Sequence, residues 1–141
     1  MPAGYSSTPL ATKLGLKPGH RLVLVHAPSG WSVEGLPNDV SVLRRRTPLA
    51  DVAVAFFSQA ADLKREVGGL STSIVPDGAL WLAWPRRASG HLSDITDQGV
   101  RRAILPLGLV DVKVAALDDD WSGLKMVWRK ERRPGLRQSG P

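Results

Sequence analysis

Two short segments of this sequence combine residue types that could bind a ligand. The first, residues 26–31, reads His-Ala-Pro-Ser-Gly-Trp, and the second, residues 84–90, reads Trp-Pro-Arg-Arg-Ala-Ser-Gly. A guanidinium group pairs with phosphates and carboxylates, and a glycine lets the backbone approach a ligand closely. The two segments therefore predict a site for a small anionic ligand or an acidic protein partner. The predicted ligand-binding residues are Ser29, Gly30, Trp31, Trp84, Arg86, Arg87 and Ser89.

Several of these residues also have a purely structural interpretation. Trp31 and Trp84 flank the predicted ligand site between the two segments and could stack on a ligand, although core packing is the commoner use of tryptophan. Arg86 and Arg87 could instead pair with Asp94 or Asp111. The alternatives differ in their consequences, because binding arginines can be removed at little cost to stability and structural ones cannot.

Other candidate constellations are weaker. His26, Ser29 and Asp51 contain the residue types of a hydrolytic triad, yet the sequence has no G-x-S-x-G elbow and a proline separates the first two. Residues 118–120 are three consecutive aspartates, whose carboxylates point in different directions on a turn, so we expect a hairpin turn rather than a cation site. No histidine has a partner at metal-ligand spacing. We predict no catalytic residue and no metal.

Length and composition favour one small domain. The chain has 141 residues, 43% of them hydrophobic, and no cysteine. The missing cysteines exclude disulfides, zinc-thiolate sites and a cysteine nucleophile. The chain lacks an apolar run of about 18 residues, and its first residues lack the charged and apolar blocks of a signal peptide. These features predict a cytoplasmic protein with a single domain over residues 1–131 and no membrane contact.

The positive charge is concentrated at the carboxyl terminus. The formal net charge is +6, but Lys125 and the residues after it include six Lys and Arg against Glu131 alone. Residues 132–141 contain few apolar side chains, so we expect a disordered, solvated tail. Binding of nucleic acid through this tail is an alternative, weakened by the nearly neutral remainder of the chain.

Hydrophobic periodicity predicts an α/β domain. Apolar and β-branched runs indicate strands, and apolar residues at helical spacing indicate helices. Strands that alternate with helices favour a mainly parallel sheet, and the last two strands are expected to pair antiparallel at its edge, with Lys113 and Lys125 protecting exposed backbone. The expected strands are 21–26, 40–44, 50–57, 79–84, 109–117 and 124–129, and the expected helices are 9–14, 58–74 and 96–105, with a turn at 76–78.

Two resemblances to known families follow from longer stretches. Residues 74–85, Ile-Val-Pro-Asp-Gly-Ala-Leu-Trp-Leu-Ala-Trp-Pro, resemble the equivalent stretch of Rossmann-like methyltransferases, and the closing strand pair resembles their final antiparallel hairpin. From about Tyr5 to Lys130 the chain is similar to a family of short, mostly actinobacterial proteins with a domain of unknown function. The motifs that carry this similarity are residues 8–19, 84–90, 105–113 and 121–125. Together they imply a reduced Rossmann-like fold, and the second family brings no established reaction.

The expected cofactor loop departs from those of methyltransferases and dinucleotide enzymes. Such loops need several glycines, but residues 26–31 contain only Gly30, and Pro28 lacks an amide donor. The second strand should end in an acid that accepts hydrogen bonds from ribose, but Arg44, Arg45 and Arg46 follow it. These arginines could share an anion site with Arg86 and Arg87, or form a solvated loop.

The departures lead us to predict no cofactor and no binding of S-adenosylmethionine or NAD. The sequence therefore favours a non-catalytic binding or regulatory domain on a degenerate methyltransferase-like fold as our leading hypothesis. A divergent S-adenosylmethionine-dependent methyltransferase is the first alternative, and a nucleic-acid binder is the second.

Overall fold

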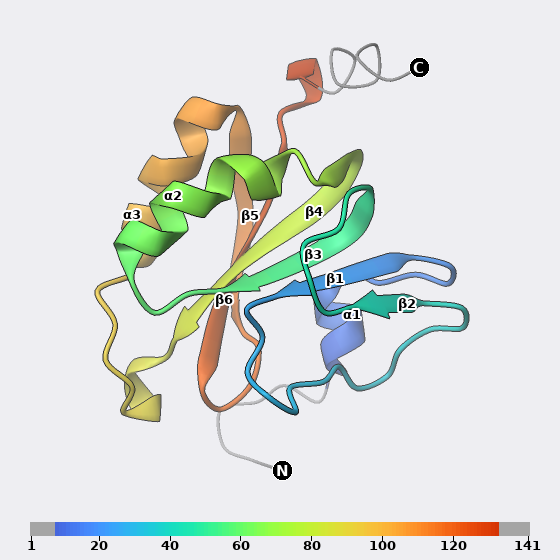
Figure 1. Cartoon of the computed structure of the whole chain (residues 1–141), viewed down its shortest axis with the longest axis horizontal. Coiled ribbons are helices and arrows are strands. Elements are labelled where there is room, and N and C mark those ends of the chain that lie inside the picture. The colour runs from blue at the N-terminus through green and yellow to red at the C-terminus, as the bar shows by residue number, and fades with distance from the viewer. Residues whose placement is uncertain (1–7, 133–141) are drawn as a thin grey trace.

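A computed structural model describes residues 8–132 and contains one six-stranded sheet in the order β2-β1-β3-β4-β6-β5 (Figure 1). The strands are β1 (Arg21–Val25), β2 (Ser41–Leu43), β3 (Ala50–Phe56), β4 (Ile74–Pro85), β5 (Leu109–Ala116) and β6 (Trp121–Trp128). The α-helices are α1 (Leu10–Leu14), α2 (Ala60–Ser71) and α3 (Asp97–Ile104), and short 3-10 turns cover Arg87–Ser89, Leu105–Leu107 and Lys130–Arg132. Arg132 is thus in a 3-10 turn, and the rest of the predicted tail, 133–141, lies outside the described residues.

The predicted fold class is confirmed. β2, β1, β3 and β4 pair parallel, and β6 pairs antiparallel with both β4 and β5. The last two strands form an antiparallel pair at one edge of the sheet, as predicted, with β6 between β4 and β5 and β5 outermost. Lys125 consequently does not protect an edge strand.

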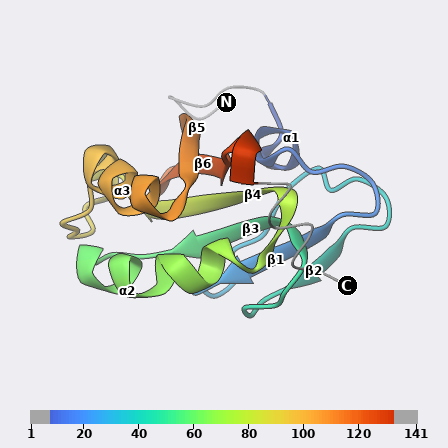
Figure 2. The ribbon, with the colours of Figure 1, turned by 90° about the horizontal axis from the view of Figure 1, so that it is seen from above.

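The sheet carries a hydrophobic core on each face. On one face α2 and α3 pack side by side over a core that includes Leu82 and Trp84 (Figures 1 and 2). On the other face α1 and the segment between β1 and β2 cover a core that includes Trp81 and Trp31. The alternation of residues 81–84 between the two faces is the period of an extended strand, as predicted.

Local sequence signals mark the start of α3 and the end of α1. The Thr96 hydroxyl accepts a hydrogen bond of 3.0 Å from the Gly99 amide and begins α3. Within this helix the Arg101 guanidinium lies 2.9 Å from both Asp97 and Asp111. The hydrogen bond from Arg101 lowers the pKa of Asp97, and its two carboxylate partners raise the pKa of Arg101. α1 ends at Gly15, whose φ of 84° is left-handed.

The predicted end of the helix over 58–74 and the predicted turn at 76–78 are both wrong, because a strand begins there. α2 ends at Ser71, and Ile74 already pairs with Ala50 as the first residue of β4. Pro76, Asp77 and Gly78 lie inside β4, at a register shift between Ala50 and Val52 of β3. A β-bulge accommodates a proline that cannot donate to the ladder, and a Cβ on Gly78 would lie 2.9 Å from the Asp51 carbonyl oxygen.

No helix among residues 8–132 is long and apolar enough to span a bilayer.

Candidate functional site

The carboxyl ends of β1, β3 and β4 meet at one edge of the sheet, which we call the carboxyl edge. β1 has β2 on one side and β3 on the other, so the strand order reverses there. Ligands of open α/β sheets bind at such a reversal, outside the carboxyl ends of the strands. The residues at this edge are 26–31 after β1, 57–59 after β3, 86–91 after β4 and 117–120 between β5 and β6.

Trp31 fills space at the carboxyl edge instead of offering a ring to a ligand. Its side chain is 9% exposed and packs edge-on against Phe56, at 4.8 Å between ring centroids. The indole N–H donates a 2.9 Å hydrogen bond to Asp118 Oδ2. Trp84 belongs to the core on the opposite face of the sheet. The two tryptophans therefore do not form one stacking platform.

Asp118 organises the turn between β5 and β6. Its Oδ1 accepts hydrogen bonds of 2.8 Å from the amides of Asp120 and Trp121, while Oδ2 holds the indole of Trp31. The acidic run thus forms a hairpin turn, as predicted. No group of three or more histidine, aspartate or glutamate side chains within residues 8–132 could hold a metal ion.

The segment after β4 is attached to this turn. The amide of Arg86 donates to the Asp120 carbonyl at 2.8 Å, and its guanidinium donates to the Asp118 carbonyl at 3.2 Å. The Ser89 hydroxyl donates to the Arg86 carbonyl at 2.7 Å and so closes the 3-10 turn. Arg87 is exposed. Neither arginine pairs with Asp94 or Asp111, which bind the Ala60 amide and Arg101 respectively.

The three arginines after β2 diverge. Arg44 donates to the carbonyls of Trp31 and Pro28, at 2.8 Å and 3.3 Å, and so fastens the loop after β1. Arg46 turns toward the end of α2, where its Nε donates to Ser73 Oγ at 3.3 Å. A Cβ on Gly69 of α2 would lie 2.7 Å from the Arg46 guanidinium, so this helical glycine gives the arginine room. The arginines thus do not gather at one anion site with Arg86 and Arg87.

Ser29 and Gly30 remain accessible at the carboxyl edge. Both are exposed, and Gly30 has a φ of 78°. A Cβ built on Gly30 would meet nothing within 4 Å, so the space above this backbone is open. Ser58 and Gln59, which follow β3, are exposed as well.

His26 is the residue whose environment the sequence did not reveal. Its Nε2 lies 2.9 Å and 3.1 Å from the two carboxylate oxygens of Glu66 on α2, and its ring contacts Phe57 edge-on at 5.6 Å. Its φ of 58° is left-handed, which is uncommon for a residue with a side chain. Its side chain is 52% exposed, next to the strand reversal. Asp51 lies at the opposite edge, where its carboxylate accepts from the Arg21 amide, so no hydrolytic triad forms.

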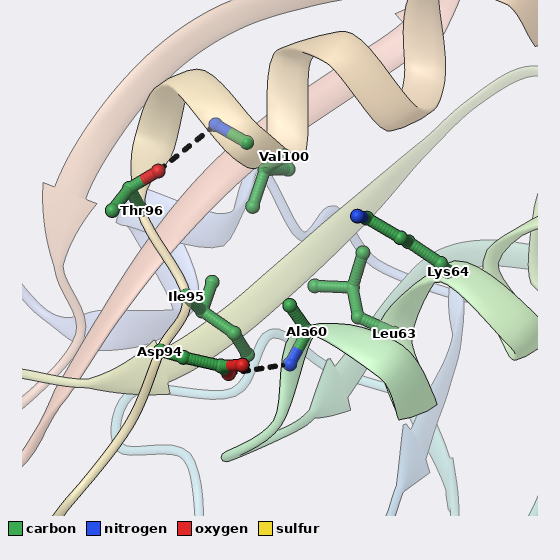
Figure 3. Close-up of a pocket in the computed structure, with 8 residues that line it drawn as sticks. Ala60, Leu63, Lys64, Asp94, Ile95, Thr96 and Val100 are labelled. Carbon is green, nitrogen blue, oxygen red and sulfur yellow. Dashed lines mark hydrogen bonds between the residues drawn. The ribbon is translucent and has the colours of Figure 1, made fainter.

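A small cavity of about 130 Å³ lies between the first turns of α2 and α3 (Figure 3). Its wall is mainly apolar, from Leu63, Ile95 and Val100, with Lys64 at one side. The Asp94 carboxylate accepts from the Ala60 amide at 2.7 Å, which occupies a donor at the start of α2. This cavity offers no cluster of polar groups comparable to the His26 surroundings.

Comparison with solved structures identifies the architecture. A "SAM dependent methyltransferase" from Aquifex aeolicus is similar at a TM-score of 0.59, with 13% identity over 84% of this chain and 87% of that one. The fold is that of methyltransferases. Magnesium protoporphyrin IX methyltransferase from Synechocystis with bound SAM has a TM-score of 0.59 and 10% identity over 85% and 74% of the two chains. Fibrillarin from Aeropyrum pernix, with natively bound S-adenosyl-L-methionine, has a TM-score of 0.53 and 13% identity over 84% and 73%.

No protein-family model and no curated sequence matches the chain, so its similarity to the actinobacterial family stays a prediction. The structural comparisons overturn our leading hypothesis of a non-catalytic binding or regulatory domain, because proteins named as methyltransferases share the fold over most of the chain. They favour the first alternative, a divergent methyltransferase. The missing glycines of the loop after β1 are therefore compatible with a methyltransferase-like sheet.

Proposed function

We propose that this chain is a divergent S-adenosylmethionine-dependent methyltransferase whose active site is the carboxyl edge of β1 and β3. The observation that carries the proposal is the exposed His26–Glu66 pair beside the strand reversal of a methyltransferase-like sheet. This position, outside the carboxyl ends of the strands at the strand reversal, is where open α/β sheets bind their ligands. Names and bound cofactors of the similar structures support the same activity.

The residues present at the carboxyl edge fit the cofactor on one side. The open backbone of Ser29 and Gly30 and the exposed Ser58 and Gln59 would hold it between the ends of β1 and β3. When bound, S-adenosylmethionine supplies an electrophilic methyl group. The fit is poorer at the ribose, because Arg44 stands where an acid would accept hydrogen bonds and its guanidinium is already bonded to the β1 loop. We therefore expect modest affinity, with a dissociation constant of about 10 μM, or about −7 kcal/mol.

His26 is suited to move a proton from the methyl acceptor. An acceptor oxygen or nitrogen attacks the methyl group more readily after it loses a proton, and histidine is the side chain most often used for this step. The Glu66 carboxylate fixes the imidazole through Nε2. In that arrangement the other ring nitrogen, Nδ1, is the atom available to take the proton.

Isothermal titration calorimetry with S-adenosylmethionine and S-adenosylhomocysteine tests the proposal. Gly30→Ala places a Cβ in the space that the cofactor needs and should weaken binding at least tenfold. Gly19→Ala is the matched control, because Gly19 has a φ of 79° against 78° for Gly30, and a Cβ there also meets nothing within 4 Å. Both substitutions carry the same backbone cost, so a selective effect of Gly30→Ala supports the site.

Absence of saturable heat with the unmodified protein at about 1 mM cofactor would exclude the proposed activity, since that limit corresponds to about −4 kcal/mol. Equal weakening by Gly19→Ala and Gly30→Ala would place the cofactor elsewhere.

A further inference from the structure

A second cavity lies at the opposite edge of the sheet, where β3 and β4 begin, and it has no part in the proposed methyl transfer. Its volume is about 350 Å³. Val52, Ala79 and Val127 form an apolar floor from three neighbouring strands, and the end of α1 forms a wall. Charged side chains surround this floor: Lys17, Lys125, Asp51 and Asp77, together with His20. We call this space the amino-edge cavity.

Lys125 is the unusual member of this lining. It lies on β6, between β4 and β5, so protection of an edge strand does not account for it. Its side chain is partly buried, and among residues 8–132 it makes no hydrogen bond and no ion pair. A partly buried ammonium group is normally compensated by a carboxylate or a carbonyl, because desolvating a charge is costly. This compensation is missing here.

The neighbours of Lys125 make its charge less favourable. Lys113 lies directly opposite on β5, and like charges in a cross-strand pair destabilise a sheet. The Lys113 ammonium is 5.8 Å from the centre of the Trp81 ring, so it has an interaction of its own. Burial, and after it the Lys113 charge, lowers the pKa of Lys125.

The acids of the amino-edge cavity do not neutralise Lys125. Neither Asp51 nor Asp77 lies within 4.0 Å of its ammonium. The Asp51 carboxylate accepts a hydrogen bond of 2.7 Å from the Arg21 amide and sits on β3, two strands away from β6. The positive groups thus lie toward α1 and β6, and the negative groups lie toward the starts of β3 and β4.

We propose that the amino-edge cavity binds a small anionic group, a carboxylate or a phosphate, through Lys125, with Lys17 as a second positive group in the lining. The anion supplies the missing counter-charge to a partly buried ammonium group. The apolar floor lies next to it and accommodates the non-polar remainder of a small ligand. Asp51 and Asp77 in the lining favour a ligand that also carries a hydrogen-bond donor, because their carboxylates can accept a hydrogen bond from it.

The test is an NMR titration of the full chain with inorganic phosphate and, separately, with acetate. Amides of Gly15, Gly78 and Val127 should shift saturably with dissociation constants of about 10 mM or below, the range of a single charge-assisted contact. Lys125→Met should abolish these shifts. Lys113→Met is the matched control, because it removes the opposing lysine, which does not line the cavity, and should leave binding intact.

The two probes separate the sources of the anionic group. Shifts with acetate alone assign a carboxylate ligand, shifts with phosphate alone assign a phosphate ligand, and shifts with both assign the charge as the shared determinant. No saturable shift with either probe, or equal loss in the two variants, overturns the proposal. Neither variant changes the carboxyl edge, so this result is independent of the calorimetry with S-adenosylmethionine.

Discussion

Asp118 should be the most important polar side chain for stability at the carboxyl edge. Asp118→Ala removes three hydrogen bonds, two from backbone amides of the turn and one from the Trp31 indole. The two amides can bond to water afterwards, so each loss costs about 1 kcal/mol, whereas the indole of a side chain only 9% exposed is left without an acceptor at about 1–3 kcal/mol. We expect the free energy of unfolding to fall by about 3–5 kcal/mol and Tm by about 10–20 °C.

Urea denaturation followed by tryptophan fluorescence measures this loss, and Asp119→Ala is the control. Asp119 is the next residue, is exposed and has no hydrogen bond or ion pair within residues 8–132, so its removal should change stability by less than about 0.5 kcal/mol. Trp31→Phe keeps a six-membered aromatic ring but loses the five-membered ring with its N–H donor, and should cost about 2 kcal/mol from the lost hydrogen bond and the gap that remains. The reasoning is refuted if Asp118→Ala and Asp119→Ala unfold at the same urea concentration.

Two further predictions concern α2 and β6. Gly68→Ala should stabilise the protein by about 1 kcal/mol, because a Cβ at this helical position meets nothing within 4 Å. Gly69→Ala should increase stability less, because its Cβ would displace the Arg46 side chain from Ser73. Equal increases for the two variants in thermal denaturation would contradict this. The pKa of Lys125 is lowered from its ordinary value of 10.5, so its charged form destabilises the folded protein. Between the folded-state pKa and 10.5 the unfolded chain binds more protons, and the free energy of unfolding therefore increases with pH in that range. Lys125→Met should remove this increase in urea denaturation across that range, and an unchanged pH profile would count against the assignment.

The sheet and its two cores could be predicted from short-range pattern. Residues 79–84 are uniformly apolar, which indicates a strand buried on both faces, and their alternation assigned Trp81 and Trp84 to different cores as the structure has them. The bulge at Pro76 and Gly78 could not be predicted, because the same residues favour a turn. Only the pairing of β4 with β3 distinguishes the two.

The candidate site could be predicted in position but not in detail. The two segments selected from their residue types, 26–31 and 84–90, lie after β1 and at the end of β4, and Ser29 and Gly30 are accessible there. The pairing of His26 with Glu66 spans 40 residues and that of Trp31 with Asp118 spans 87, and no local pattern encodes either. The arginines illustrate the same limit, because a run of three guanidinium groups does not reveal that Arg44 and Arg46 bond to different parts of the chain.

These long-range contacts bear on how a loop with one glycine and a proline could serve a cofactor. Residues 26–40, all described, include no helix that would fix the loop after β1. Two sets of hydrogen bonds to other segments hold this loop instead. The Trp31 indole donates to Asp118, and the Arg44 guanidinium donates to the carbonyls of Pro28 and Trp31. A glycine-rich turn adopts its shape through its own sequence, whereas this loop is held by β2 and by the turn between β5 and β6. The open backbone at Ser29 and Gly30 is therefore positioned by tertiary contacts, which a search for glycine motifs does not detect.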